Sequence, residues 1–251
     1  MQLPNPKDAR HKGWLYRTLS SIADDPFLAS LLAFKGGTCA AMLGFLDRFS
    51  VDLDFDYRGK EHSFDEARAH LESIFADLNL VVKDKSPRIP QYFLRYSAPD
   101  GERNTLKIDM SFPPVAGNIY EAKRLIDIDR IFTCQTIETM FANKLVSLID
   151  RFHKSGSIAG RDLYDIHFFF ENSHRYTEAV ILERAQKPLS AFFEDLIAFI
   201  EQQVTDGLLA EDLNALVPPE TFRRIRKTLK QETLVFLRDE LARQNNEGSV
   251  H

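Results

Sequence analysis

Residues 50–56 read Ser-Val-Asp-Leu-Asp-Phe-Asp, and this alternation constrains the fold more than any other stretch of the chain. Successive side chains of a β-strand point to opposite faces, so one face of this strand is apolar and the other acidic. The acidic face carries the carboxylates of Asp52, Asp54 and Asp56. Carboxylates this close repel one another unless a cation compensates them, and oxygen ligands suit Mg²⁺. The alternative is an edge strand whose acidic face is simply solvated.

A glycine-rich turn lies just upstream of this strand. Lys35-Gly36-Gly37-Thr38 follows an apolar run and leads into residues 39–46, which predict a short apolar helix. Paired glycines let the backbone approach a ligand closely. Thr38 is the predicted N-cap, and the N–H groups of a helix N-terminus suit a phosphate. A turn of this kind is common, but the acidic strand close behind it makes a phosphate site a stronger interpretation.

A later stretch supplies another carboxylate. Residues 105–112 alternate in the same way, and their polar face carries Lys107, Asp109 and Ser111. If this strand lies beside the acidic one, Asp109 joins the earlier carboxylates on one face of the sheet. Such a set beside a glycine-rich turn suits two-metal phosphoryl transfer. The alternative is that Asp109 is an ordinary exposed strand residue.

Two predicted helices further along the chain place charges near their packed sides. Lys144 lies close to the apolar face of the predicted helix 136–151, so it either snorkels to solvent or meets an anion. Asp162 lies toward the packed side of the next helix, where an unpaired charge is costly. Asp165 is instead predicted to form a surface pair with Arg161, four residues away. Asp162 is therefore the favoured site residue.

Together these segments resemble the AbiEii/AbiGii toxin family of nucleotidyltransferases, to which MenT-type toxins are related. The resemblance covers about residues 30–170. It is carried by Lys35-Gly36-Gly37-Thr38, Arg48-Phe49-Ser50-Val51-Asp52-Leu53-Asp54-Phe55, Asp109, Asn143-Lys144-Leu145 and Arg161-Asp162-Leu163-Tyr164-Asp165. It implies the DNA polymerase β-like nucleotidyltransferase fold, an α/β (α+β) architecture with a mixed sheet flanked by helices and a helical C-terminal half. We expect a nucleotidyltransferase domain at residues 1–130 and a helical domain at 131–251.

The resemblance also implies roles for individual residues. The implied metal ligands are Asp52, Asp54 and Asp109, and Asp109 would also act as general base. The implied nucleotide-binding residues are Lys35, Gly36, Gly37, Thr38, Ser50 and Lys144. Lys144 would reach the phosphates, and Asp162 would position Lys144 or the nucleotide. The catalytic set is therefore Asp52, Asp54, Asp109, Lys144 and Asp162.

The activity implied by the resemblance is Mg²⁺-dependent transfer of a nucleoside monophosphate from an NTP to the 3′ end of tRNA, with two metal ions. The chain would be the toxin of a type IV-like toxin–antitoxin or phage-defence system, with an antitoxin protein encoded nearby. Two alternatives stay open. The enzyme would modify a protein hydroxyl instead of RNA, or the chain would be a catalytically silent module that binds a nucleotide or a partner.

Composition limits the remaining classes of protein. The chain has 251 residues, enough for one large domain or two small ones. Its two cysteines suit a reducing cytoplasm without disulfides, and no stretch predicts a signal peptide or a membrane span. The net charge of −5 argues against a broadly basic nucleic-acid surface. One local basic cluster, between Arg223 and Lys230, is either a solvated helix face or a contact for RNA phosphates.

Overall fold

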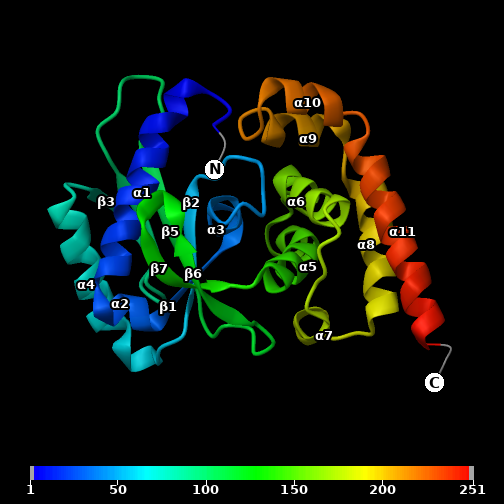
Figure 1. Cartoon of the computed structure of the whole chain (residues 1–251), viewed down its shortest axis with the longest axis horizontal. Helices are drawn as coiled ribbons and strands as arrows, with labels where there is room; N and C mark the ends of the chain where they lie inside the picture. Colours follow the sequence, from blue (N-terminus) through cyan, green and yellow to red (C-terminus); the bar gives the residue numbers. More distant parts are fainter. Residues whose placement is uncertain (1–2, 249–251) are drawn as a thin grey trace. The chain divides into compact units, whose positions relative to one another are not determined.

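A seven-stranded mixed sheet organises the first part of the chain (Figure 1). In this computed structural model, which describes residues 3–248, two compact units are present. The sheet unit comprises the chain up to Pro114 together with Ile119–Thr136. The helical unit comprises Val115–Asn118 and the chain from Ile137 onward. The α/β class with a mixed sheet, predicted from the sequence, is confirmed.

The strand order is β3-β4-β5-β2-β1-β7-β6. β2 runs parallel to β5, and β1 runs parallel to β7, whereas the other neighbours are antiparallel. The strands are β1 Leu32–Lys35, β2 Asp52–Tyr57, β3 Val81–Lys85, β4 Tyr92–Arg95, β5 Thr105–Ser111, β6 Tyr120–Leu125 and β7 Arg130–Gln135. In the sequence, strand-like runs near 51–58, 79–84, 92–98 and 105–112 predict β2 to β5. The sequence pattern misses β1, which is a short buried run, and it misses β6 and β7, where alternation is weak.

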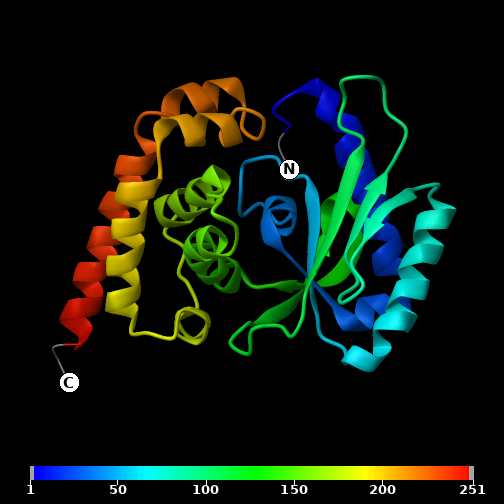
Figure 2. The same cartoon turned by 180° about the vertical axis from the view of Figure 1, so that it is seen from behind.

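The apolar face of the sheet is covered by helices. In both views, α1 and α4 lie on one side of the sheet and α3 on the other (Figures 1 and 2). Phe75 of α4 packs edge-on against Tyr92 of β4, with ring centroids 5.0 Å apart. The helices of this unit are α1 Ala9–Asp24, α2 Pro26–Leu31, α3 Gly36–Met42 and α4 Phe64–Asp77, with short 3-10 turns at Pro6–Asp8, Glu61–Ser63 and Ile126–Ile128. The polar side chains of the central strands are thus left on the face that α3 borders.

A buried histidine fixes the start of β2. Nε2 of His11 lies 2.8 Å from the carbonyl oxygen of Val51, the residue that precedes β2. A carbonyl only accepts hydrogen bonds, so Nε2 carries the proton in this contact. Burial lowers the pKa of His11 to about 4, and the ring is therefore neutral at pH 7. His11 thereby ties α1 to the segment that leads into the acidic strand.

The helical unit consists of α5 to α11 within the described residues. These are α5 Ile137–Ser155, α6 Gly160–Glu171, α7 Glu178–Ala185, α8 Leu189–Gln203, α9 Asp206–Leu213, α10 Pro219–Ile225 and α11 Leu229–Gly248. α5 packs against α6, where the rings of Phe141 and Phe169 lie 5.0 Å apart. The sequence pattern predicts a helix over residues 221–244, but the structure interrupts it between α10 and α11. None of the described helices is long and apolar enough to cross a membrane.

Candidate active site

Strand register brings the predicted carboxylates together on the polar face of the sheet. Asp54 of β2 pairs directly with Asp109 of the parallel strand β5. On its other side, Asp54 pairs with Lys35 of β1. One row across the sheet therefore reads Asp109, Asp54, Lys35, and the neighbouring row places Asp52 beside Lys107. Adjacent strands lie about 4.8 Å apart, so Asp54 and Asp109 are as close as neighbouring strands allow.

The glycine turn is in direct contact with this row of side chains. Gly36 has a φ of 76°, a conformation that glycine adopts at little cost. A Cβ atom at Gly36 would overlap the carboxylate of Asp54, so the turn and the acid are in close contact. A Cβ atom at Gly37 would lie 2.9 Å from the hydroxyl of Ser50, which is buried. The predicted nucleotide-binding residues Gly36, Gly37 and Ser50 thus lie against the acidic strand.

Thr38 does not cap the helix, and that prediction from the sequence is wrong. α3 begins at Gly36, its N-cap is Lys35, and Thr38 is the third residue inside the helix. The helix starts early because Lys35 is extended and Gly36 accepts the positive φ that turns the chain. The Thr38 hydroxyl instead donates a hydrogen bond of 2.5 Å to the carbonyl oxygen of Asp52. Thr38 therefore fastens α3 to the start of β2.

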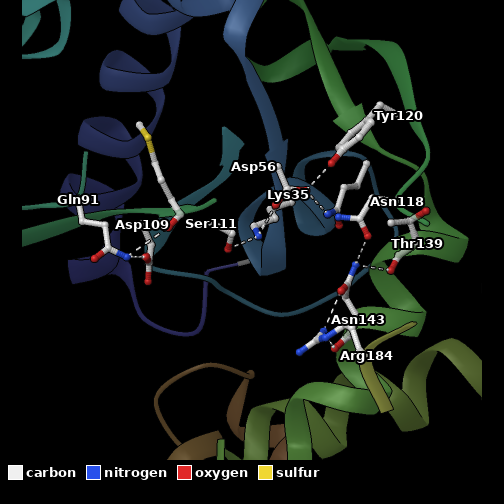
Figure 3. Close-up of polar contacts among 12 residues, drawn as sticks. Lys35, Asp56, Gln91, Asp109, Ser111, Asn118, Tyr120, Thr139, Asn143 and Arg184 are labelled. Atoms are coloured by element: carbon white, nitrogen blue, oxygen red, sulfur yellow. Dashed lines mark hydrogen bonds and ion pairs between the residues drawn. The ribbon is translucent and has the colours of Figure 1, made fainter. Parts of the chain in front are cut away.

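Asp109 has two polar partners of its own. Lys107, two residues earlier on the same face of β5, forms an ion pair with its carboxylate. The side-chain amide of Gln91 donates to the other carboxylate oxygen (Figure 3). Lys107 compensates the negative charge of Asp109, and Gln91 orients the group. Neither Lys107 nor Gln91 was assigned a role from the sequence, although strand alternation does place Lys107 on this face.

Asp56, the third acid of β2, is buried and accepts several hydrogen bonds. It accepts hydrogen bonds of 2.7 Å from Lys35, 2.8 Å from Tyr120 and 2.6 Å from Gln135. Lys35 also donates to the hydroxyl of Ser111 at 2.7 Å (Figure 3). This network ties β1, β2, β5, β6 and β7 together. The ammonium of Lys35, a predicted nucleotide-binding group, is therefore directed at Asp56.

The donor set on this face suits a hard divalent cation. The side chains of Asp52, Asp54 and Asp109 offer only oxygen atoms, as Mg²⁺ requires. Across residues 3–248, however, no group of three or more histidine, cysteine or acidic side chains converges as a metal site would. The chemistry of the three carboxylates fits Mg²⁺, and their side chains are not gathered around one point.

A second charged cluster lies between α5 and α6 in the helical unit. Lys144 of α5 forms ion pairs with Asp162 at 2.6 Å and with Asp165 at 3.0 Å, and both carboxylates are fully buried. The second oxygen of Asp162 lies 3.4 Å from Arg151. Burial raises the pKa of Asp162, but the charges of Lys144 and Arg151 outweigh it and bring this pKa below its ordinary value. Lys144 thus meets anions, one of the two predicted outcomes.

Asp165 corrects a prediction. The sequence pattern places it in a surface pair with Arg161, but Asp165 is buried and contacts Lys144. Asp162 and Asp165 are three residues apart, a spacing that puts both on one face of α6. This spacing places Asp165 beside Asp162 on the side of α6 that faces Lys144.

The comparisons with known proteins bear on these two clusters together. The family model described as "Nucleotidyl transferase AbiEii toxin, Type IV TA system" matches residues 17–234. The chain belongs to this AbiEii family. The family match spans the acidic face of the sheet unit and the Lys144 cluster of the helical unit, and it establishes the chain as a nucleotidyltransferase of a toxin family.

Solved structures support the fold. A Helicobacter pylori protein described as a candidate nucleotidyltransferase is 20% identical, with a TM-score of 0.61, and the likeness covers 96% of this chain and 98% of that one. JHP933 from Helicobacter pylori is 21% identical, with a TM-score of 0.58, and 99% of each chain is covered. No curated protein matches the chain.

Further contacts hold α5 of this AbiEii chain in place. Arg184 of α7 donates to the side-chain oxygen of Asn143 at 2.8 Å (Figure 3). Arg184 also forms an ion pair with Asp150 at 2.7 Å. Asn143 also donates to Asn118 at 3.0 Å. Asn143 immediately precedes Lys144, so these bonds fix the turn of α5 from which Lys144 projects. The contacts of Arg184 join segments far apart in the chain, and the sequence gives no signal for them.

The basic cluster of the C-terminal region is smaller than the sequence indicates. Arg223, Arg224, Arg226 and Lys227 are exposed around the interruption between α10 and α11. Lys230 instead donates hydrogen bonds to the carbonyl oxygens of Glu201 and Val204, at 3.0 and 2.8 Å, and so caps the end of α8. Four exposed cations remain in this cluster.

Proposed function

We propose that this AbiEii-family chain transfers a nucleoside monophosphate from an NTP to the 3′ end of tRNA in a Mg²⁺-dependent reaction. The observation that carries the proposal is that Asp54 and Asp109 lie directly opposite each other in the register of two parallel strands. Gly36 is in close contact with the side chain of Asp54. Two acids side by side at a glycine turn suit a reaction in which phosphate charge must be held and a hydroxyl must lose its proton.

The roles proposed for the sheet unit follow from this arrangement. Asp52 and Asp54 would hold Mg²⁺, which neutralises phosphate charge when bound. The turn at Gly36, Gly37 and Thr38, with Lys35 and Ser50 beside it, would bind the triphosphate. Asp109 would accept the proton of the attacking hydroxyl, whose oxygen forms a bond to the α-phosphorus as pyrophosphate leaves.

Lys144 is the proposed phosphate ligand of the helical unit. Its ammonium is already oriented by two buried carboxylates, those of Asp162 and Asp165. A lysine held in this way keeps its charge in one place and loses little side-chain entropy when it meets a phosphate. We accordingly assign the catalytic chemistry to a nucleotidyltransferase domain at residues 1–130, and we assign Lys144 and Asp162 to a helical domain at 131–251.

The biological setting is also a proposal. The family description names a type IV toxin–antitoxin system, which favours an antitoxin partner and, by extension, a part in phage defence. NTP and tRNA meet in the cytoplasm, and the two cysteines, Cys39 and Cys134, are both free thiols, as a reducing compartment favours.

The test uses the full chain with total tRNA, Mg²⁺ and each α-³²P-labelled NTP in turn. We expect label in the RNA fraction with one or more nucleotides and none after chelation by EDTA. Label in the protein fraction would favour the second candidate, modification of a protein hydroxyl. Nucleotide binding without release of pyrophosphate would instead identify a silent binding module and overturn the proposal.

A further inference from the structure

An exposed aromatic side chain of β4 lies on the polar face of the sheet. Phe93 of β4 is 41% exposed, whereas its neighbours Tyr92 and Leu94 are buried on the opposite face. A single exposed apolar residue is common on protein surfaces and has no meaning alone. Phe93 is unusual because of what surrounds it on the same face of the sheet.

Strand register places Phe93 in line with the proposed active site. Phe93 pairs with Lys107 of β5, and Lys107 pairs with Asp52 of β2. Two strand spacings of about 4.8 Å each therefore separate Phe93 from Asp52. The ammonium of Lys107 lies 5.8 Å from the centroid of the Phe93 ring and also pairs with Asp109. Lys107 thus links the aromatic ring to the proposed general base.

The side of the site on which Phe93 lies is set by the strand order. The glycine turn follows β1, on one side of β2, whereas β5 and β4 lie on the other side. In an in-line displacement, the attacking and leaving oxygens occupy opposite sides of the phosphorus. A triphosphate held at the glycine turn would leave the β5 and β4 side for the attacking hydroxyl. Phe93 therefore lies where the acceptor would approach.

The charges around Phe93 favour a nucleic-acid acceptor. Arg95, two residues further along β4, points to the same face and is exposed. Lys107 and Arg95 flank the ring with positive charge, as a phosphate backbone requires. Aromatic rings interleaved with cations are the usual means by which proteins hold single strands, because every base offers a face for stacking.

We propose that Phe93 stacks against a base at the single-stranded 3′ end of the acceptor RNA, with Arg95 and Lys107 beside the flanking phosphates. This inference rests on the proposed function and adds a binding residue to it. Phe93 orients the acceptor so that its terminal hydroxyl reaches Asp109. The contact is with the acceptor, so the affinity for NTP does not depend on it.

Binding is measured without NTP, so that the result does not depend on the transfer reaction. A short single-stranded RNA with 2-aminopurine near its 3′ end is titrated with the wild-type chain, Phe93→Ala, Phe93→Leu and Phe93→Trp. Ile131→Ala is the matched control, since Ile131 is a 70% exposed apolar residue of the same sheet at β7. Stacking quenches 2-aminopurine fluorescence, and anisotropy of an end-labelled RNA gives Kd.

We expect Phe93→Ala and Phe93→Leu to lose the quench and to raise Kd by about 5- to 150-fold, the range that corresponds to one stacked base. Phe93→Trp should keep the fluorescence quench and the wild-type Kd, and Ile131→Ala should match the wild type in both measurements. An equal quench in the wild type and Phe93→Ala overturns the inference. So does a Phe93→Leu variant that binds as the wild type does, because the contact would then be merely apolar and would fit a protein partner.

Steady-state transfer assays separate this inference from the proposed function. Phe93→Ala should raise KM for tRNA by the same factor and leave KM for NTP unchanged. A rise in KM for NTP alone would assign Phe93 to the incoming nucleotide and overturn the inference while the proposed function stands. Label in protein instead of RNA would overturn the proposed function, and the quench would still report whether Phe93 binds RNA.

Discussion

Individual residues of this AbiEii chain have distinct electrostatic environments despite their similar positions in the sequence. Asp54 lies against Gly36 and beside Asp109, whereas Asp56, two residues later on the same face, is enclosed by Lys35, Tyr120 and Gln135. A carboxylate that already accepts three hydrogen bonds has little capacity left for a ligand. The acidic strand therefore contains one structural acid and two candidates for catalysis.

Asp54→Asn tests the catalytic assignment. The amide keeps the shape of the carboxylate but removes the charge proposed to hold Mg²⁺. We expect the rate of nucleotide transfer to fall by about 10²-fold or more, on the scale of other groups that stabilise a charged transition state. Thermal unfolding should change little. Asp84→Asn, which removes an exposed carboxylate of β3, is the control and should keep full activity. Near wild-type turnover in Asp54→Asn would exclude Asp54 from the chemistry.

Lys144→Met tests the buried cluster. It removes the cation that compensates two fully buried carboxylates, those of Asp162 and Asp165. Loss of one partner of a buried ion pair costs about 3–5 kcal/mol, so urea unfolding at pH 7 should show a loss of this order. Lys154→Met, at the exposed end of α5, should change the free energy of unfolding by much less.

The loss of stability in Lys144→Met should depend on pH. In the wild type, the pKa of Asp162 lies below its ordinary value of 3.8, so its contribution to stability is present above about pH 4 and is lost as the pH falls further. Without Lys144, burial dominates and raises the pKa of Asp162. The stability deficit of Lys144→Met should therefore be largest at pH 7 and shrink toward pH 4. A deficit that is independent of pH would show that Lys144 stabilises the fold by packing alone.

At the scale of elements, α3 depends on a single unusual backbone position. Gly36 has a positive φ, begins the helix and touches Asp54. Thr38, two residues further along the helix, donates a hydrogen bond to the carbonyl oxygen of Asp52. The helix is thus attached to the acidic strand at two points, and its position depends on that strand as much as on its own short sequence.

Gly36→Ala should disturb this attachment. The positive φ costs an alanine about 1–2 kcal/mol, and the new methyl group forces the Asp54 carboxylate to move. We expect a lower midpoint of thermal unfolding together with loss of transfer activity. Gly13→Ala is the matched control, because Gly13 lies inside α1 with no atom near its missing Cβ. It should raise stability by up to about 1 kcal/mol and leave activity unchanged. Equal effects from the two substitutions would contradict the role given to Gly36.

At the scale of the whole molecule, a net charge of −5 means that the proposed RNA acceptor would have to be attracted by a local basic surface. The exposed cations around the interruption between α10 and α11 would offer one such surface. Its size is limited by Lys230, which is committed to the end of α8. We therefore expect only a modest salt-dependent contribution of this surface to the proposed tRNA binding.

The double charge reversal Arg223→Glu with Arg226→Glu measures that contribution. We expect weaker tRNA binding and a salt dependence whose slope, log Kd against log salt, is shallower by about 2. The apparent affinity for NTP should not change. Lys7→Glu with Lys60→Glu, two exposed lysines of the sheet unit, makes the same change in net charge and serves as the control. If both pairs weaken binding equally, the effect is one of net charge, and the cluster is only a solvated face.

The sequence by itself determined the elements that carry a strong period. The alternation at 50–56 and 105–112 predicts β2 and β5, with their polar residues on one face, because a strand exposes one side to the core and the other to a different environment. The spacing of apolar residues after Thr136 predicts a helical second half, and the family resemblance predicts the nucleotidyltransferase fold. Both were confirmed.

Only the tertiary structure decided how those side chains are partnered. Asp54 and Asp109 meet because β2 and β5 are parallel neighbours, and Asp56 is buried because β1, β6 and β7 enclose it. No local pattern encodes which strands adjoin, since each pairing joins segments tens of residues apart. Asp165 was taken for a surface residue for the same reason, as its counter-ion lies on another helix. Periodicity fixes which way a side chain points, whereas strand order and helix packing fix what it meets.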